Sequence, residues 1–319
     1  MTFAPNATDA TEGVMLDDVL SCPRCRHDLP PHACVCEGCG HRYAANASGF
    51  LELTADDAIA AIDVLDATYA ADQHIAETRV YERYLKPYLA SLGPRTVIDV
   101  GCGVGRAVML MARDGYSAFG VDVPHVAPLW ADYEHDPRHL VSGDATALPF
   151  RKGVFDLAIS RGVIEHIGTS IGHYTLDGDY LEARRRFAEE LLRILRPGGR
   201  AVVTCPNKTF PIDIQHGPSD GIDPVHPVRH YLFVRTGINV HKTWGAYHLL
   251  SFPEVQRLFL AAGARSVRPL PMTGYFSFGR FQRGVLKPFE QAATAYVNHL
   301  PRALWRSPLN PYVIAEIRV

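Results

Sequence analysis

Between residues 96 and 206 the apolar positions follow two different periods in turn. Short runs that are apolar at nearly every position occur at 96–100, 117–123, 155–160 and 200–206. Such runs are typical of strands buried on both faces of a sheet. Segments with an apolar side chain every three or four residues lie at 106–113 and around 180–196, and they indicate helices that pack on the strands. The pattern therefore predicts an α/β fold with a largely parallel sheet covered on both faces.

The same two patterns extend this fold toward both ends of the chain. Residues 56–92 carry a helical apolar stripe, which Pro87 should kink or split and which Gly93 and Pro94 should end. Beyond residue 206 we expect a helix at 253–263 and strands at 266–272 and 312–319. Two insertions, at about 207–248 and 273–311, separate these elements, and loops of this length commonly form lids or substrate walls.

Residues 21–50 are rich in Cys, His, Pro and Gly, and they are too few to build an apolar core of their own. Five of the seven cysteines fall between residues 22 and 39. Four of them have the spacing C-x2-C-x10-C-x2-C, which lets four thiolates converge on one tetrahedral Zn²⁺: Cys22, Cys25, Cys36 and Cys39. The segment resembles a zinc ribbon, in which the metal is structural and drives folding.

Other ligands in this segment are possible in principle. Cys34 can take the place of Cys36, and iron can bind the same four thiolates. His27, His32 and His41 are lesser candidates, each interpreted as a surface residue. Cys102 and Cys205 follow apolar strands elsewhere in the chain and are expected to be small buried residues rather than nucleophiles.

Charge and hydropathy exclude some classes of protein. The formal net charge of −2 provides no global positive field for nucleic acid or an anionic membrane. The N-terminus lacks the basic start and apolar core of a secretory signal, and no stretch approaches about eighteen uninterrupted apolar residues. We therefore expect a soluble, cytoplasmic protein without a transmembrane segment.

The sequence VIDVGCGVGR, residues 97–106, places three glycines within five positions directly after an apolar strand. A dinucleotide-binding loop has the pattern G-x-G-x-x-G, with pyrophosphate at the following helix N-terminus. Here the third glycine, Gly105, comes one residue early, and Arg106 stands where that pattern needs glycine. A Walker-type phosphate loop is also absent from the sequence. The loop is therefore poorly matched to phosphates.

Three acidic residues accompany this loop. Asp99 ends the strand at 96–100, Asp122 ends the strand at 117–123, and Asp144, in the segment SGDATALPF, has the position of a loop after a further strand that lies between residues 123 and 155. An acid in the place of Asp122 can accept both hydrogens of a ribose diol, and Asp144 can accept from an adenine amino group. Three acids and three glycines in this order suit a cationic nucleoside that has no phosphate.

From about residue 95 to 207 the chain resembles class I S-adenosylmethionine-dependent methyltransferases. The segments that carry the resemblance occur in family order: VIDVGCGVGR, FGVDV, GDATALPF, FDLAISRGVIEHIG and LLRILRPGGRAVVTCPN. The resemblance implies a Rossmann-like domain with a mostly parallel seven-stranded sheet and S-adenosylmethionine as cofactor. We therefore divide the chain into an N-terminal tail (1–20), a zinc-ribbon-like module (21–55), a helical segment covering the cofactor site (56–92) and the methyltransferase domain (93–319).

The resemblance also implies roles for individual residues. Asp99 and Gly101 would lie near the amino acid portion of the cofactor, Asp122 would hold the ribose hydroxyls, and Asp144 with Ala145 would face adenine. Ser160 would line the methyl-donor pocket. The expected cofactor-binding set is Asp99, Gly101, Gly103, Gly105, Asp122, Val123, Asp144, Ala145 and Ser160. For any one acid taken alone, the alternative that it only caps a turn stays open.

The sulfonium of this cofactor already makes its methyl group electrophilic, so the protein must mainly align an in-line displacement and exclude water. A general base is needed only where the acceptor has to lose a proton early. Glu165 and His166, just beyond the strand at 155–160, and His216, after the strand at 200–206, are the candidates. Some family members build a divalent metal site with a glutamate three residues before such a pair and a later histidine. Here that position is Gly162, which argues against such a metal, and Glu165 and His166 can instead simply line the cofactor pocket.

The expected function is methyl transfer to a small-molecule acceptor, such as a metabolite, lipid or glycan, at an oxygen, nitrogen or carbon that the sequence does not specify. One alternative is an RNA methyltransferase acting on rRNA or tRNA, in which the ribbon residues Arg24, Arg26 and Arg42 contact RNA. Another is a non-catalytic module that binds S-adenosylmethionine and recruits a partner through the ribbon. The sequence gives no oligomeric state.

Overall fold

The structure is a computed structural model that describes residues 13–30, 35–55, 67–170, 175–213, 215–216, 226–236, 239–275 and 287–319. Within these ranges nine strands form one sheet, in the order β1-β2-β5-β4-β3-β6-β9-β13-β12. Their bounds are β1 (Ala44–Ala45), β2 (Leu51–Leu53), β3 (Thr96–Val100), β4 (Ser117–Asp122), β5 (Leu140–Gly143), β6 (Phe155–Arg161), β9 (Leu195–Pro206), β12 (Ser266–Pro269) and β13 (Tyr312–Arg318).

Six neighbouring strands, from β2 to β9, run parallel, whereas β13 is antiparallel to both β9 and β12. The expected Rossmann-like domain with a mostly parallel seven-stranded sheet is therefore confirmed, as the seven strands from β5 to β12. The sheet is longer than expected by β1 and β2, which come from the cysteine-rich segment. Leu51 of β2 pairs with Val141 of β5, so the N-terminal module extends the main sheet.

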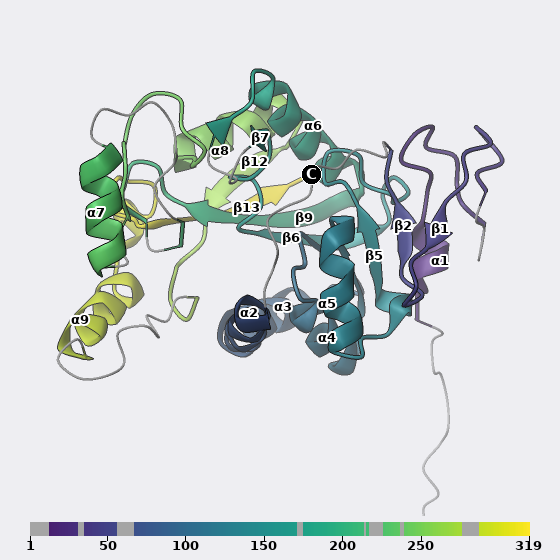
Figure 1. Ribbon diagram of the computed structural model, residues 1–319, viewed down its shortest axis with the longest axis horizontal. Coiled ribbons are helices and arrows are strands. Elements are labelled where there is room, and N and C mark those ends of the chain that lie inside the picture. The colour runs from purple at the N-terminus through teal and green to yellow at the C-terminus, as the bar shows by residue number, and fades with distance from the viewer. Residues whose placement is uncertain are drawn as a thin grey trace, which may run out of the picture.

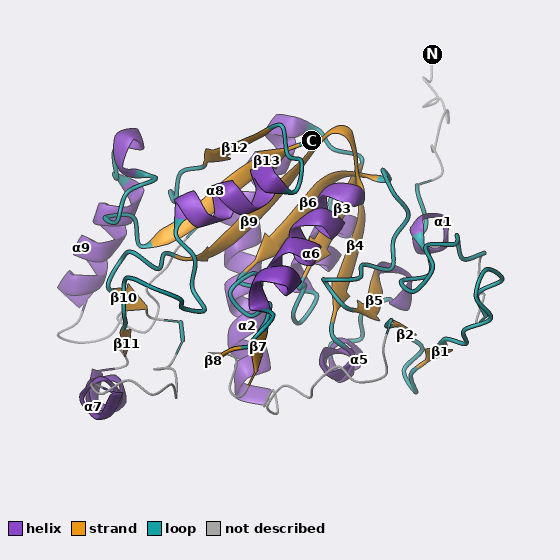
Figure 2. Ribbon diagram, turned by 90° about the horizontal axis from the view of Figure 1, so that it is seen from above, coloured by secondary structure: helices purple, strands orange, loops and turns teal. Residues whose placement is uncertain are grey.

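Helices cover both faces of this sheet, as Figures 1 and 2 show. One face carries α6 (Tyr180–Arg193) and α8 (Phe252–Ala261), and the other carries α2 (Ala67–Val80), α3 (Lys86–Leu92), α4 (Arg106–Arg113) and α5 (Ala127–Asp132). Strand side chains alternate between the two apolar cores: Ile98 packs in the core beneath α6 and α8, and Val97 in the core of the opposite face. The short helix α1 (Leu16–Val19) lies beside the edge formed by β1 and β2.

The helical segment before β3 is divided as expected from Pro87. The helices α2 and α3 are separated by one π-helical turn, Tyr81–Leu85, and Gly93 ends α3 in a left-handed conformation (φ 62°). A proline ring clashes with the carbonyl four residues earlier, here that of Arg83, and a wider turn at that place relieves the clash. The first part of the expected segment, 56–66, lies outside the described residues.

The strand expected at 200–206 begins earlier, because β9 starts at Leu195. Residues 197–199 lie inside β9, where the register against β6 shifts. Phe155 pairs with Leu195, but Leu157 pairs with Arg200, so the extra residues form a bulge. Bulges of this kind accommodate glycine and proline within a strand.

The two insertions carry short elements of their own. The first contains β10 (Ile212–Asp213), α7 (His226–Thr236) and β11 (Asn239–Val240), and the second contains α9 (Lys287–Asn298). The helices α7 and α9 lie at the opposite end of the molecule from β1 and β2 (Figures 1 and 2). A small hairpin of β7 (Thr169–Ser170) and β8 (Thr175–Leu176) precedes α6. No helix among the described ranges has both the length and the apolar character needed to cross a bilayer.

Candidate functional site

The glycine loop joins β3 to α4 at the carboxyl end of the parallel strands. Gly101 has a φ of 78°, and a Cβ there would overlap the Cγ2 of Val163. A Cβ on Gly103 would lie 3.0 Å from Oε1 of Glu77. A side chain at position 101 would therefore clash with Val163, and one at position 103 would press against the Glu77 carboxylate.

Asp122 at the end of β4 is bound to this loop. Its Oδ2 accepts a hydrogen bond from the Gly103 N–H (2.7 Å), and its Oδ1 accepts one from the Val123 N–H (2.8 Å). Burial raises the pKa of Asp122 to about 6, against the opposing effect of these two hydrogen bonds. Because a carboxylate has about four acceptor positions, the oxygens of Asp122 can still accept from a ligand.

A buried ion pair lies next to the loop. Asp99 is fully buried, and its Oδ2 accepts a hydrogen bond from Nη2 of Arg161 (3.0 Å). Burial raises the pKa of Asp99, although Arg161 opposes this effect. Within the described part of the chain, Oδ1 of Asp99 and Nε of Arg161 have no hydrogen-bond partner. A buried acceptor and a buried donor are thus available side by side.

Glu77 of α2 is a third carboxylate at the glycine loop. Together with Asp99 and Asp122 it forms a group that we call the acidic cradle. Its Oε2 accepts a hydrogen bond from the Ala107 N–H in the first turn of α4 (3.0 Å), and burial raises its pKa to about 7. Glu77 and Arg161 are not among the residues predicted from the sequence. Arg161 directly follows the expected Ser160 at the end of β6, so it could have been included, but no periodicity marks Glu77 as a neighbour of the loop.

The remaining cofactor candidates lie at the ends of β5 and β6. Asp144 follows β5, and its two oxygens accept from the N–H (2.7 Å) and the Oγ1 (2.9 Å) of Thr146, so it does cap its own turn. Ala145 beside it packs partly against the core. Ser160 in β6 is fully buried, and its Oγ has no hydrogen-bond partner among the described residues.

Glu165, His166 and His216 form a second cluster. Their ligand-type atoms all lie within 4.8 Å of one another, and the rings of His166 and His216 are 5.1 Å apart. Val163, which packs on Gly101, is two residues before Glu165, so the cluster is next to the glycine loop. The sequence analysis named these three residues separately, and the fold brings them together.

Asp213, which the sequence analysis missed, holds His216 in place. Its Oδ2 lies 2.7 Å from Nδ1 of His216, and both residues are buried. Burial opposes protonation of His216, but Asp213 and Glu165 raise its pKa. Burial likewise opposes ionisation of Asp213, but its hydrogen bonds with His216 lower its pKa.

Arg184 of α6 connects the two chain segments around this cluster. Its Nε donates to the carbonyl of Ile167 (3.2 Å), and its Nη2 donates to the carbonyl of His248 (2.6 Å). The His248 ring lies 5.4 Å from that of His216, and burial lowers its pKa to about 2. A neutral histidine and a fixed arginine therefore border the cluster.

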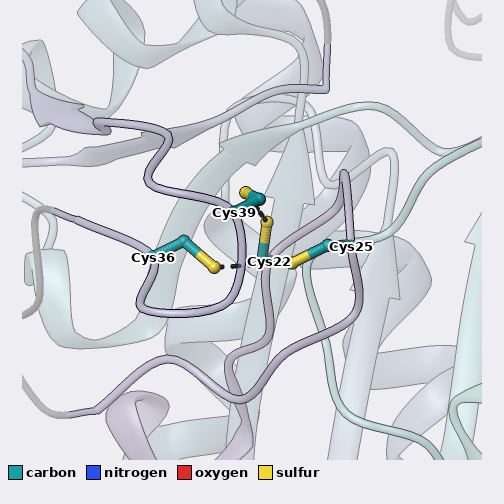
Figure 3. A group of neighbouring side chains, drawn as sticks. All are labelled: Cys22, Cys25, Cys36 and Cys39. Carbon is teal, nitrogen blue, oxygen red and sulfur yellow. Dashed lines mark hydrogen bonds between the residues drawn. The ribbon is translucent and has the colours of Figure 1, made fainter.

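The four predicted zinc ligands also converge (Figure 3). The Sγ atoms of Cys22 and Cys39 are 3.7 Å apart, and those of Cys25 and Cys36 are 3.5 Å apart. Four thiolates around one Zn²⁺ at about 2.3 Å have sulfur separations of about 3.8 Å, so the four residues fit a tetrahedral zinc site. Cys34 and His32 lie outside the described residues. Cys102 and Cys205 are buried in the main domain, as expected.

The comparisons with known proteins identify the type of domain that carries these residues. Residues 98–203 match the model of a methyltransferase domain family. The chain accordingly carries a class I S-adenosylmethionine-dependent methyltransferase domain, with a four-cysteine cluster compatible with a small zinc ribbon ahead of it.

Individual relatives are similar only in part. The chain is 27% identical over 155 residues to a probable chloroplastic tocopherol O-methyltransferase of Oryza sativa subsp. japonica, covering 44% of this chain and 38% of that protein. It is 31% identical over 134 residues to the tRNA (carboxymethyluridine(34)-5-O)-methyltransferase of Arabidopsis thaliana, covering 41% of this chain and 29% of that protein. A solved complex between the Haloferax volcanii Trm112 methyltransferase activator and a methyltransferase has 18% identity and a TM-score of 0.45, covering 79% of this chain and 96% of that one. The chain thus spans well under half the length of these two curated relatives.

Proposed function

We propose that the protein transfers a methyl group from S-adenosylmethionine to a small-molecule acceptor. The observation that carries this proposal is the acidic cradle around a glycine loop that lacks a phosphate site. S-adenosylmethionine has a sulfonium, an ammonium and one carboxylate, and therefore a net positive charge. Three carboxylates, Glu77, Asp99 and Asp122, suit this charge.

Each part of the cradle has a matching part of the cofactor. The unpartnered Oδ1 of Asp99 suits the ammonium of the amino acid portion, and the Nε of Arg161 suits its carboxylate. Asp122 would accept from the ribose hydroxyls, next to Gly103 and Val123. Asp144 and Ala145 would lie at the adenine, where Asp144 keeps acceptor capacity beyond its own turn.

We expect the acceptor to bind beside Glu165, His166 and His216. Val163 packs on Gly101, so the segment 163–166 borders the loop that would hold the amino acid portion. The buried Oγ of Ser160 lies near the end of β6, three residues before this segment begins. When bound, the cofactor supplies an electrophilic methyl group, and the protein aligns the acceptor for in-line displacement and excludes water.

Two arginines of the ribbon make contacts within the protein, and this favours a small-molecule acceptor over RNA. Nη1 of Arg26 donates to the carbonyl of Leu148 (3.0 Å) and pairs with Glu190 (3.0 Å). Nη1 of Arg24 lies 2.7 Å from Nδ1 of His41. These two cations are engaged within the protein, which weakens the case for a ribbon that reads phosphates.

A labelled-methyl screen tests this proposal. The full chain is incubated with S-adenosylmethionine carrying a labelled methyl group and with cell extract divided into RNA, lipid and small-molecule fractions. We expect label in the small-molecule or lipid fraction. Label confined to RNA would replace this acceptor class with the RNA alternative, and absence of both label transfer and cofactor binding would overturn the enzyme assignment.

A further inference from the structure

Glu165, His166 and His216 have the composition and placement of a metal-binding site. One carboxylate and two imidazoles present ligand-type atoms within 4.8 Å of one another. Two ligands at about 2.1 Å from one ion are about 3.0 to 3.5 Å apart, so modest side-chain rotations would bring all three onto a single cation.

The buried carboxylate is the first independent sign of a ligand. Glu165 is fully buried, and neither of its oxygens has a hydrogen-bond partner among the described residues. Burying a carboxylate without a partner is costly, and such groups are normally paired with a cation or bound to a metal. Arg184, the nearby buried arginine, donates to the carbonyls of Ile167 and His248 instead.

The second sign is the orientation of His216. Its Nδ1 is held by Asp213 (2.7 Å), which itself accepts from the backbone N–H of Gln215 (2.8 Å). Metal-binding histidines commonly have one ring nitrogen fixed by a carboxylate in this way, because the contact orients the ring and makes the other nitrogen a better ligand.

We propose that Glu165, His166 and His216 bind one divalent transition-metal cation. Two histidines with one carboxylate suit ions from Mn²⁺ to Zn²⁺, and three protein ligands leave positions for an exchangeable ligand. Gly162 stands where some family members have a further glutamate ligand, so it argues against their four-ligand site but leaves the three ligands proposed here. The missing Cβ of Gly162 (φ 67°) would lie 3.6 Å from Oε1 of Glu165. No side chain from that position closes the site.

A role for this cation in catalysis rests on the methyl transfer proposed above. A divalent ion bound here lowers the pKa of a coordinated hydroxyl group. The acceptor's proton then leaves to water, its oxygen forms the bond to the methyl carbon, and the bond from that carbon to the sulfonium sulfur breaks. The products are a methyl ether or ester and S-adenosylhomocysteine. The metal site therefore selects acceptors that methylate on oxygen.

Metal binding by the full chain tests the site directly. Protein that retains metal in its cysteine cluster is titrated with Mn²⁺, and the free ion is followed by electron paramagnetic resonance. Mn²⁺ prefers oxygen and nitrogen ligands over thiolates, so the cysteines compete little. We expect about one tightly bound Mn²⁺ per chain, and a loss of affinity of about 10-fold to 100-fold in Glu165→Gln and in His216→Gln. The exposed His230→Gln on α7 serves as the matched control and should bind like the wild type.

Equilibrium dialysis against Co²⁺ and Zn²⁺ covers the case in which the site prefers those ions. Equal binding of all three ions by wild type, Glu165→Gln and His216→Gln would overturn the inference. Calorimetric binding of S-adenosylmethionine checks that each variant is folded. A wild type that binds the ion at this site but transfers no methyl group in the screen would overturn the proposed function and leave the metal site standing.

Discussion

Asp122 connects the backbone of the glycine loop with the expected position of the ribose. Because its oxygens accept from the N–H groups of Gly103 and Val123, its remaining acceptor capacity is fixed in direction. Hydrogen bonds to a charged group contribute about 1.5 to 3 kcal/mol, so Asp122→Ala should weaken S-adenosylmethionine binding by about 10-fold to 100-fold. Isothermal titration calorimetry measures the change. Asp136→Ala, at a partly exposed aspartate that pairs with Arg138, is the control, and equal affinities for both variants would contradict the assignment of Asp122.

Gly101 is the loop residue with the least room for a side chain. A methyl group there would meet Val163 and would also impose the left-handed conformation on alanine, at a cost of about 1 to 2 kcal/mol. We expect Gly101→Ala to lower both the melting temperature and cofactor affinity. Gly115→Ala separates the two effects, because Gly115 has a φ of 93° but nothing within 4 Å of its Cβ position. If both variants lost the same stability, the contact with Val163 would be unimportant.

At the scale of the elements, Glu316 connects β13 with its neighbours. Its carboxylate accepts from Arg268 (2.7 Å), Arg318 (2.8 Å) and the hydroxyl of Tyr88 on α3 (2.8 Å). Although burial opposes ionisation, these contacts lower the pKa of Glu316 to about 2. A lowered pKa means that the stabilisation is complete above the unfolded-state value of about 4.3 and is lost as the pH falls toward 2.

Replacing this carboxylate should therefore change the acid side of the stability profile. Glu316→Gln should cost on the order of 1 to 2 kcal/mol near neutral pH, since its arginine partners are partly exposed, and the difference from wild type should shrink below about pH 4. Urea unfolding between pH 7 and pH 3 measures it. Glu189→Gln, which removes a surface ion pair with Arg185, should change little at any pH. A constant difference across this range would contradict the pKa assignment.

The sequence predicts those parts of the structure that are defined by neighbouring residues, and it does not predict those that depend on contacts between distant segments. The helix 106–113 and the strand 117–122 were predictable within a residue, because period and flanking glycines define them. The glycine loop and Asp122 were predictable because strand ends and spacing fix them. Glu77 and Asp213 were not, since each acts through contact with a distant segment: Glu77 with Ala107, and Asp213 within an insertion that has no periodic pattern.

At the scale of the whole molecule, the cysteine-rich module is packed on the methyltransferase domain. Leu29 and Tyr43 belong to the same apolar core as α6 and α8. The Ser21 N–H donates to the carbonyl of Pro149 (3.0 Å), and the Arg151 N–H donates to that of Val19 (2.8 Å). The expectation that these residues are too few for a core of their own holds, but burial against the main domain supplies part of what the metal was expected to supply alone.

Because the ribbon and the main domain share this core, loss of zinc from the ribbon should also destabilise the main domain. In Cys22→Ala we expect about one fewer zinc ion per chain, because a structural site needs all four ligands. Loosening of the ribbon should also expose the core around Leu29 and lower the unfolding temperature of the whole chain. Metal analysis and thermal unfolding measure the two effects. Cys205→Ala, a buried cysteine of the main domain, should keep its zinc. Zinc content equal to wild type in Cys22→Ala would refute the site, and loss of zinc without any change in unfolding temperature would mean that the two parts fold independently.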